Sequence, residues 1–60
     1  MIEKTEKAFN KAGELKKLVS EMIGEAVNLD LTRLLKQVDA DLMDIRHKLS
    51  EAIKIARNEV

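Results

Sequence analysis

Asp44, His47 and Glu51 are the residues whose types and spacing most suggest chemistry. His47 is the only histidine, and the carboxylates lie three residues before it and four residues after it. This spacing places all three side chains on one face of a helix. An imidazole with two carboxylates is able to ligate a metal ion, but metal sites in helical bundles use ligands that point inward from several helices. The heptad pattern described below turns this set outward, so we expect no bound metal.

His47 also lies in the segment Asp44-Ile45-Arg46-His47-Lys48-Leu49, which resembles the H-box of sensor histidine kinases over six residues. The resemblance implies a phospho-accepting histidine that faces outward on a dimeric helical hairpin. The sequence departs from that family because His47 lies on the second predicted helix, no proline follows it, and the chain leaves no room for an ATP-binding domain. We therefore interpret His47 as a solvated histidine beside two carboxylates.

Other catalytic groups are scarce. Ser20, Ser50, Thr5 and Thr32 have no histidine at a plausible distance on a short hairpin, and no glycine-rich loop follows a strand. A thin helical bundle also offers little concavity for a substrate pocket. We predict that the protein is not an enzyme and that it uses no cofactor.

The composition favours a small all-α protein. The 60 residues include no cysteine, proline, tryptophan or tyrosine, and 11 basic residues balance 11 acidic ones. Zero net charge argues against long-range attraction to nucleic acid or anionic lipid. A chain of this length is only marginally stable without oligomerisation. The N-terminus has no secretory pattern and no apolar run approaches the roughly 20 residues of a membrane span, so we expect a cytoplasmic protein with no membrane partner.

Two heptad-spaced apolar stripes predict two helices, over about 3–27 and about 31–58. With Thr5 as position a, the first stripe has a positions Thr5, Ala12, Val19 and Ala26 and d positions Ala8, Leu15, Met22 and Leu29. The second stripe contains Leu31, Leu35, Val38, Leu42, Ile45, Leu49, Ala52 and Ala56. Alternating steps of three and four residues are typical of helices that pair along a seam.

The predicted turn, about 28–30, lies between the two stripes. Asn28 tolerates the left-handed conformation of a helix C-cap, and Asp30 is a strong N-cap for the following helix. Folding the chain about Leu29 pairs the stripes antiparallel and brings Leu15 near Leu42. The sequence thus predicts a single domain over 1–60 that folds as an αα-hairpin.

Six large apolar side chains remain on the flank of this seam: Phe9, Leu18, Ile23, Leu34, Ile53 and Ile55. Leaving each one in water forfeits roughly 1.5–3 kcal/mol. A second hairpin that covers them gives a four-helix bundle, and a two-fold homodimer is the commonest way to obtain one. We therefore predict that these six residues mediate self-association.

Two further surfaces are candidate partner sites. Lys4, Lys7 and Lys11 form a basic strip on the first helix, and Ala40, Met43 and His47 form a small outward patch on the second. In length and architecture the chain is similar to the RNA-binding hairpin dimers of the plasmid copy-control type, which implies nucleic acid as an alternative partner. Neutral charge and the lack of aromatic residues for base stacking argue against that partner.

We therefore expect a small non-enzymatic protein–protein interaction or regulatory module that acts as a homodimeric helical bundle. Two alternatives stay open. One is a hairpin dimer that binds RNA through the basic strip, and the other is a subunit of an obligate hetero-complex. Phosphate contacts lose affinity steeply with salt, whereas apolar docking does not, so salt dependence separates the first alternative from protein binding.

Overall fold

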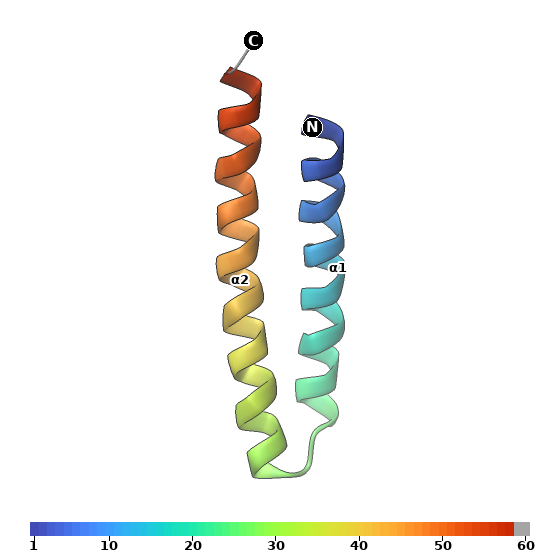
Figure 1. The fold of residues 1–60 in the computed structure, drawn as a ribbon. Coiled ribbons are helices and arrows are strands. Elements are labelled where there is room, and N and C mark those ends of the chain that lie inside the picture. The colour runs from blue at the N-terminus through green and yellow to red at the C-terminus, as the bar shows by residue number, and fades with distance from the viewer. Residues whose placement is uncertain (59–60) are drawn as a thin grey trace.

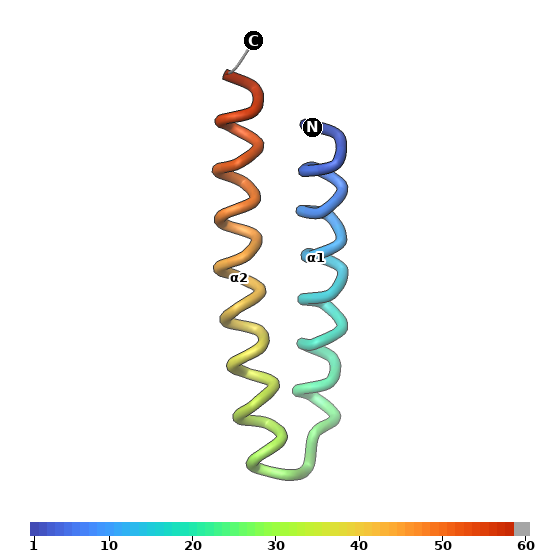
Figure 2. Tube along the Cα trace, viewed as in Figure 1, coloured from blue at the N-terminus to red at the C-terminus, as the bar shows by residue number. Residues whose placement is uncertain are grey.

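A computed structural model describes residues 1–58, and within them the chain forms two helices and no strand. Helix α1 spans Ile2–Glu25, helix α2 spans Leu29–Asn58, and residues 26–28 join them. The helices lie side by side and run antiparallel, so the first turns of α1 lie beside the last turns of α2 (Figure 1, Figure 2). The predicted fold class, a two-helix antiparallel hairpin, is confirmed.

The hairpin is a thin rod. Its Cα atoms extend over 49 × 14 × 11 Å, with a radius of gyration of 14.2 Å. A compact domain of the same length has a radius of gyration of about 10 Å. Each helix therefore has one neighbour only, and most of its circumference faces outward.

Local hydrogen bonds fix the ends of the helices at the turn. Helix α1 ends where Ala26 becomes extended, with φ −70° and ψ 131°, while its N–H still donates to carbonyl oxygens one turn earlier. At the start of α2, the side-chain Oδ1 of Asn28 accepts the N–H of Leu31 at 3.0 Å. The Thr32 hydroxyl donates to the Asn28 carbonyl oxygen, also at 3.0 Å. Asn28 is thus the N-cap of α2, whose first helical residue is Leu29.

This arrangement corrects the predicted turn. Asn28 does not take the left-handed conformation, because no non-glycine residue described up to Asn58 has a positive φ. Asn28 caps α2 instead, and Asp30, expected as that cap, lies inside the first turn, where its carboxylate favours the positive end of the helix dipole. The first helix ends at Glu25 rather than near residue 27, and the second begins at Leu29 rather than near residue 31.

The core is small and lies on a different face from the one expected. Among residues 1–58 three side chains are buried: Val19 on α1 and Leu35 and Leu42 on α2. Leu15 and Met22, expected at the centre of the seam, are 49% and 47% exposed. The predicted a positions still face α2, but the predicted d positions Ala8, Leu15 and Met22 are replaced by the residues that follow them, Phe9, Lys16 and Ile23. Because the a positions keep their contact, the contact face turns by about 50°, half of the 100° step between successive residues.

The half-buried residues show the same rotation on both helices. On α1 they include Thr5, Phe9, Ala12, Lys16 and Ile23, and on α2 they include Asp39, Arg46, Leu49, Ile53 and Ala56. Each of these rows follows steps of three, four or seven residues, as one face of a helix must. The face that joins the helices is therefore less apolar than the stripe that the sequence suggested.

Polar contacts between the helices account for this choice of face. The Lys16 Nζ lies 3.2 Å from the Asp39 Oδ1, and both side chains are only about a quarter exposed. The guanidinium carbon of Arg46 lies 4.6 Å from the centroid of the Phe9 ring, a cation–π distance. Gly13 leaves room for that guanidinium, because a Cβ at Gly13 would lie 3.4 Å from the Arg46 Nη2. We call Phe9, Gly13 and Lys16 with Asp39 and Arg46 the closed edge of the hairpin.

The closed edge holds charge where water has little access. The Asp39 Oδ1 and the Arg46 Nε are both shielded from solvent, and neither has an aligned hydrogen-bond partner among the described residues. Lys16 and Asp39 therefore form an ion pair rather than a well-aligned hydrogen bond. Farther from the turn, the Arg57 Nη2 donates to the Glu6 Oε1 at 3.1 Å. Turning either helix would leave a partly buried charge without its partner, which is costly.

Candidate interaction surface

The rotation of the helices leaves an apolar row exposed on each of them. The α1 row is Leu15, Leu18 and Met22, and the α2 row is Leu31, Leu34, Val38 and Ile45, with the exposed Asp41 between its last two members. These side chains are between 37% and 59% exposed. Their spacing of three, four or seven residues makes each row one stripe of its helix. We call these seven residues the open face.

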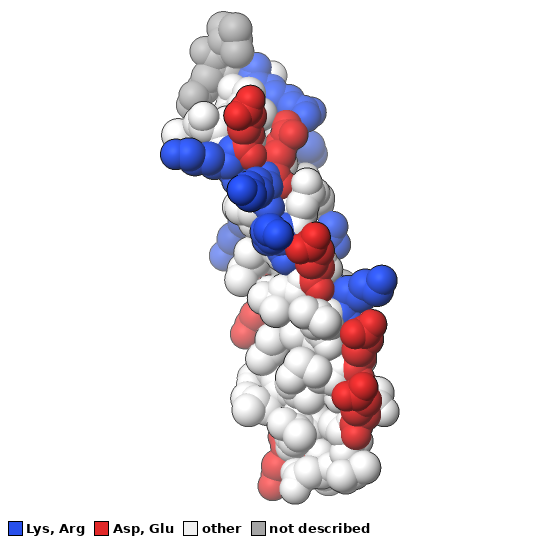
Figure 3. Space-filling model, turned by 90° about the vertical axis from the view of Figure 1, so that its right-hand side faces the viewer, with Lys and Arg blue, Asp and Glu red and all other residues white. Residues whose placement is uncertain are grey.

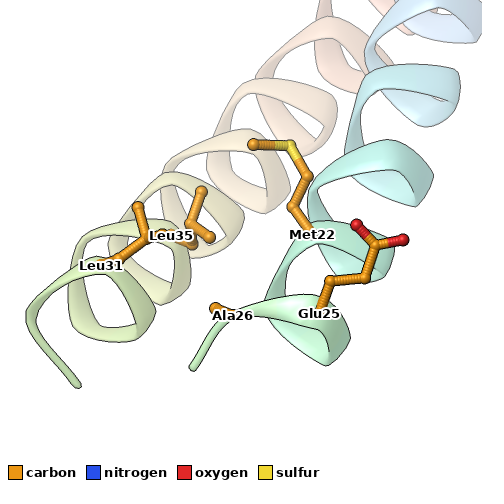
Figure 4. Close-up of a pocket in the computed structure, with 5 residues that line it drawn as sticks. All are labelled: Met22, Glu25, Ala26, Leu31 and Leu35. Atoms are coloured by element: carbon orange, nitrogen blue, oxygen red, sulfur yellow. The ribbon is translucent and has the colours of Figure 1, made fainter. Parts of the chain in front are cut away.

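The two rows lie on the same side of the hairpin. Each row precedes the contact positions of its own helix by one residue, and in an antiparallel pair of right-handed helices that offset points to the same side from both. Met22 and Leu31 also line one surface hollow beside the turn, together with Glu25, Ala26 and Leu35 (Figure 4). The hollow measures about 290 Å³, at the lower limit for small-molecule pockets, so it suits an inserted side chain better than a ligand.

Charge is distributed unevenly along the rod. Figure 3 shows an uncharged expanse over the half nearest the turn, with acidic side chains along its borders, and mixed charges over the other half. On α1 the row from Leu15 to Met22 continues toward the N-terminus into Lys11 and Lys4, and the third lysine of the basic strip, Lys7, lies beside them; all three are exposed. We call the half that contains the open face the turn half and the half that contains the basic strip the open-end half.

The rod exposes more surface than a compact monomer would. Its accessible surface is 4921 Å², whereas a compact protein of 6.8 kDa exposes about 3,950 Å². The difference is about 970 Å². A stable protein interface buries about 800 Å² on each partner, so the surplus is of the size that one such contact removes from water.

The six predicted self-association residues separate into two groups. Phe9, Ile23 and Ile53 are half-buried and face the other helix of the same hairpin. Leu18 and Leu34 lie on the open face, 56% and 59% exposed. Ile55 is 62% exposed but lies in the open-end half, apart from both. The rotation of the helices therefore turns three of the six predicted residues toward the other helix of the same hairpin, where they are only partly accessible.

The remaining residues of the open face were assigned to the wrong side of the seam. Leu15, Met22, Leu31, Val38 and Ile45 belong to the heptad stripes, so the sequence pattern placed them inside the hairpin. A signal for their exposure is present in the chain, because shifting the seam by one position brings Lys16 opposite Asp39. The pattern of apolar residues alone does not take the Lys16 and Asp39 ion pair into account.

The outward patch and the histidine set lie away from the open face. Ala40, Met43 and His47 are exposed on α2, each one residue beyond a position that contacts α1, and Met43 is 59% exposed. Two carboxylates that flank the histidine pair with lysines on their own helix: Asp44 with Lys48 at 3.1 Å, and Glu51 with Lys54 at 3.6 Å. Within residues 1–58 no group of three or more potential ligands is placed to hold a metal ion.

The basic strip is partly neutralised. Lys11 pairs with Glu14 at 3.5 Å, and both side chains are more than two-thirds exposed. Surface pairs of this kind contribute little to stability. Lys16, which continues the strip in sequence, is withdrawn from it because it pairs with Asp39 on the closed edge.

The described part of the chain thus offers an exposed apolar face. Neither helix, as far as Asn58, has a stretch long and apolar enough to cross a bilayer. In comparisons with protein-family models, with curated proteins and with solved structures, nothing matches this chain. The open face is therefore the feature of the molecule from which a function is inferred.

Proposed function

We propose that this protein is a small non-enzymatic interaction module that works as a homodimer, in which two hairpins join through their open faces to form a four-helix bundle. The dimer then presents its outer surfaces, including the Ala40, Met43 and His47 patch, to a protein partner. Its activity is binding.

The observation that carries the proposal is the exposed apolar row on each helix. Seven aliphatic or thioether side chains lie on one side of a rod that buries three of its own. Apolar patches of this extent on a small protein mark contact surfaces. The surplus of about 970 Å² over a compact monomer matches the area that a stable interface buries on each partner.

A second copy of the chain is the occupant that best fits this surface. The open face has the same two-helix width as the hairpin, so a second open face covers it along both rows. An isologous contact of this kind is the commonest way for a soluble protein to oligomerise. It also yields the four-helix arrangement in which side chains from facing helices share one core.

Leu34→Lys and Met43→Lys form a matched pair of variants that tests the proposal. Both residues are 59% exposed on α2, but only Leu34 lies on the open face. Burying the exposed part of Leu34 is worth about 0.9–1.8 kcal/mol per copy, because full burial is worth roughly 1.5–3 kcal/mol. Two copies per dimer give a rise in the dimer Kd of roughly 20- to 400-fold for Leu34→Lys. Met43→Lys should change it less than threefold.

Sedimentation equilibrium, with circular dichroism over the same concentration series, measures these constants. A wild-type chain that stays monomeric and fully helical at millimolar concentration would refute the dimer. A monomer that is partly unfolded would refute it as well and would favour the obligate hetero-complex. Equal effects of Leu34→Lys and Met43→Lys would mean that the open face is not the contact.

A role of the basic strip in binding nucleic acid has a separate test. Lysine–phosphate contacts make affinity fall steeply between 50 and 200 mM salt. We expect labelled single-stranded RNA to show no such salt-dependent binding in fluorescence anisotropy, because the chain has no net charge and Lys11 is paired with Glu14. Tight binding at low salt that Lys4→Gln and Lys7→Gln together abolish would show the opposite.

A further inference from the structure

We infer that the two copies dock through their turn halves and that the basic strips stay outside the contact. This inference rests on the proposed homodimer and specifies which part of each rod the partner covers. It follows from the uneven distribution of charge along the open side of the hairpin.

On α1 the exposed stripe changes character at one point. Lys4, Ala8 and Lys11 precede Leu15, Leu18 and Met22 in one continuous row of three- and four-residue steps, so two lysines lie on this side. On α2 the apolar row runs from Leu31 to Ile45, and an exposed lysine, Lys48, follows it. The surface that gains from burial therefore covers the turn half, and cations occupy the rest of the same side.

A dimer in which the reversed rods overlap along their whole length is disfavoured by this row. With the two-fold axis at the middle of α1, Lys4 would lie over Met22 of the second copy and Lys11 over Leu15. Each ammonium group would lose water without meeting a carboxylate at the centre of the contact, and burying a charge in this way is costly.

Overlap of the two turn halves avoids that cost. The open faces then cover each other, apolar side chains meet apolar side chains except at Asp41 in the α2 row, and the hollow beside the turn receives a side chain of the partner. The acidic borders of the turn half stay at the rim, where water screens them. Lys4 and Lys7 remain solvated beyond the end of the contact.

The geometry of the rod makes these arrangements distinguishable with a single label. The hairpin is 49 Å long, so a full-length reversed overlap places the two turns about that distance apart. In turn-half overlap the turns are no farther apart than the overlapped segment. The stretch from residue 15 to residue 26 spans about 17 Å at 1.5 Å per residue, so the separation stays within about 30 Å even with the added reach of two labels.

Val27→Cys carrying a nitroxide label provides the measurement. The natural chain has no cysteine, and Val27 is fully exposed in the turn, so one label is introduced per chain without altering a contact. Pulsed electron–electron double resonance on the labelled dimer should give a distance of about 30 Å or less. A dominant distance near 49 Å would overturn the inference while leaving the homodimer intact. Absence of any dipolar coupling, with a monomeric mass in light scattering, would instead refute the proposed function.

Lys4→Leu gives an independent readout on the unlabelled chain. If Lys4 lies outside the contact, removing its charge should change the dimer Kd less than threefold. If the rods overlap fully, the new leucine would lie against Met22 of the second copy, and the dimer should tighten at least tenfold. The second result would overturn turn-half docking even if the label at residue 27 perturbed the turn.

Discussion

Removing the charge of Asp39 should destabilise the hairpin far more than removing the charge of Asp44. Both aspartates lie on α2, and each pairs with a lysine, at 3.2 Å for Lys16 with Asp39 and at 3.1 Å for Lys48 with Asp44. The pairs differ in burial and in that Lys16 lies on the other helix, whereas Lys48 lies on the same helix as Asp44. Asp39 and Lys16 are 27% and 25% exposed, whereas Asp44 and Lys48 are 63% and 75% exposed.

The magnitude follows from that difference in burial. At 3.2 Å and an effective dielectric constant of 20, the attraction between Lys16 and Asp39 is about 5 kcal/mol before desolvation is subtracted. Removing one partner of a fully buried pair costs about 3–5 kcal/mol, and one-quarter exposure reduces this to about 1–3 kcal/mol for Asp39→Asn. The exposed pair within α2 contributes at most about 0.5 kcal/mol, so Asp44→Asn should cost no more than that.

Thermal unfolding followed by circular dichroism at one fixed protein concentration measures both effects. A loss of 1 kcal/mol lowers the Tm of a domain of this size by about 4–8 °C, so we expect a loss of at least 4 °C for Asp39→Asn and about half that or less for Asp44→Asn. The substitutions are chemically identical, which cancels the effect of helix propensity. Equal shifts would refute the assignment of the Lys16 and Asp39 contact to the interior of the hairpin.

A double variant identifies the source of the loss. Replacing a buried ion pair by apolar residues of similar size is often neutral or stabilising, whereas removing one partner strands the other charge. Lys16→Met with Asp39→Leu should therefore regain most of the stability lost in Asp39→Asn. A double variant as unstable as the single one would show that the pair acts through something other than charge compensation.

Four further variants test the glycines and the turn. Gly24→Ala should raise stability in thermal unfolding by up to about 1 kcal/mol, because no atom lies within 4 Å of the added Cβ and alanine favours the helix. Gly13→Ala should gain less, since its methyl group would meet the Arg46 Nη2 at 3.4 Å; a larger gain at Gly13 than at Gly24 would contradict that contact. Asn28→Ala should cost about 0.5–2 kcal/mol in urea unfolding through loss of the bond to the Leu31 N–H. Asp30→Ala should cost less, and the reverse order would restore Asp30 as the cap.

The number, length and antiparallel order of the helices could be predicted from the sequence because the apolar periodicity is long and a turn segment interrupts it once. The rotation of each helix about its own axis could not be predicted in this way. Phe9, Lys16 and Ile23 form a row as regular as Ala8, Leu15 and Met22, and both rows share the same a positions. Counting apolar residues favours the row of Ala8, Leu15 and Met22, because the other row contains Lys16. The first row faces α2 because Asp39 and Arg46 supply partners across the contact.

The rotation of the helices also decided which residues of the open face could be predicted from the sequence. Leu18 and Leu34 could be predicted as surface residues because they lie outside both possible seams. The other five residues of the open face could not, since their exposure depends on contacts between residues more than 20 positions apart in the chain. The cap at Asn28 was misassigned for a local reason: an asparagine beside a turn is compatible with either helix end, and only the hydrogen bond to Leu31 distinguishes them.

The closed edge has a consequence for how far assembly can proceed. A surface that pairs with its own copy is consumed when two chains meet, so growth requires a second adhesive side. On this hairpin the opposite side carries only the small Ala40, Met43 and His47 patch, and the charges of Lys16, Asp39 and Arg46 at its edge already have partners within the same chain. We expect the protein to stop at a finite particle rather than extend into filaments, even when it is concentrated.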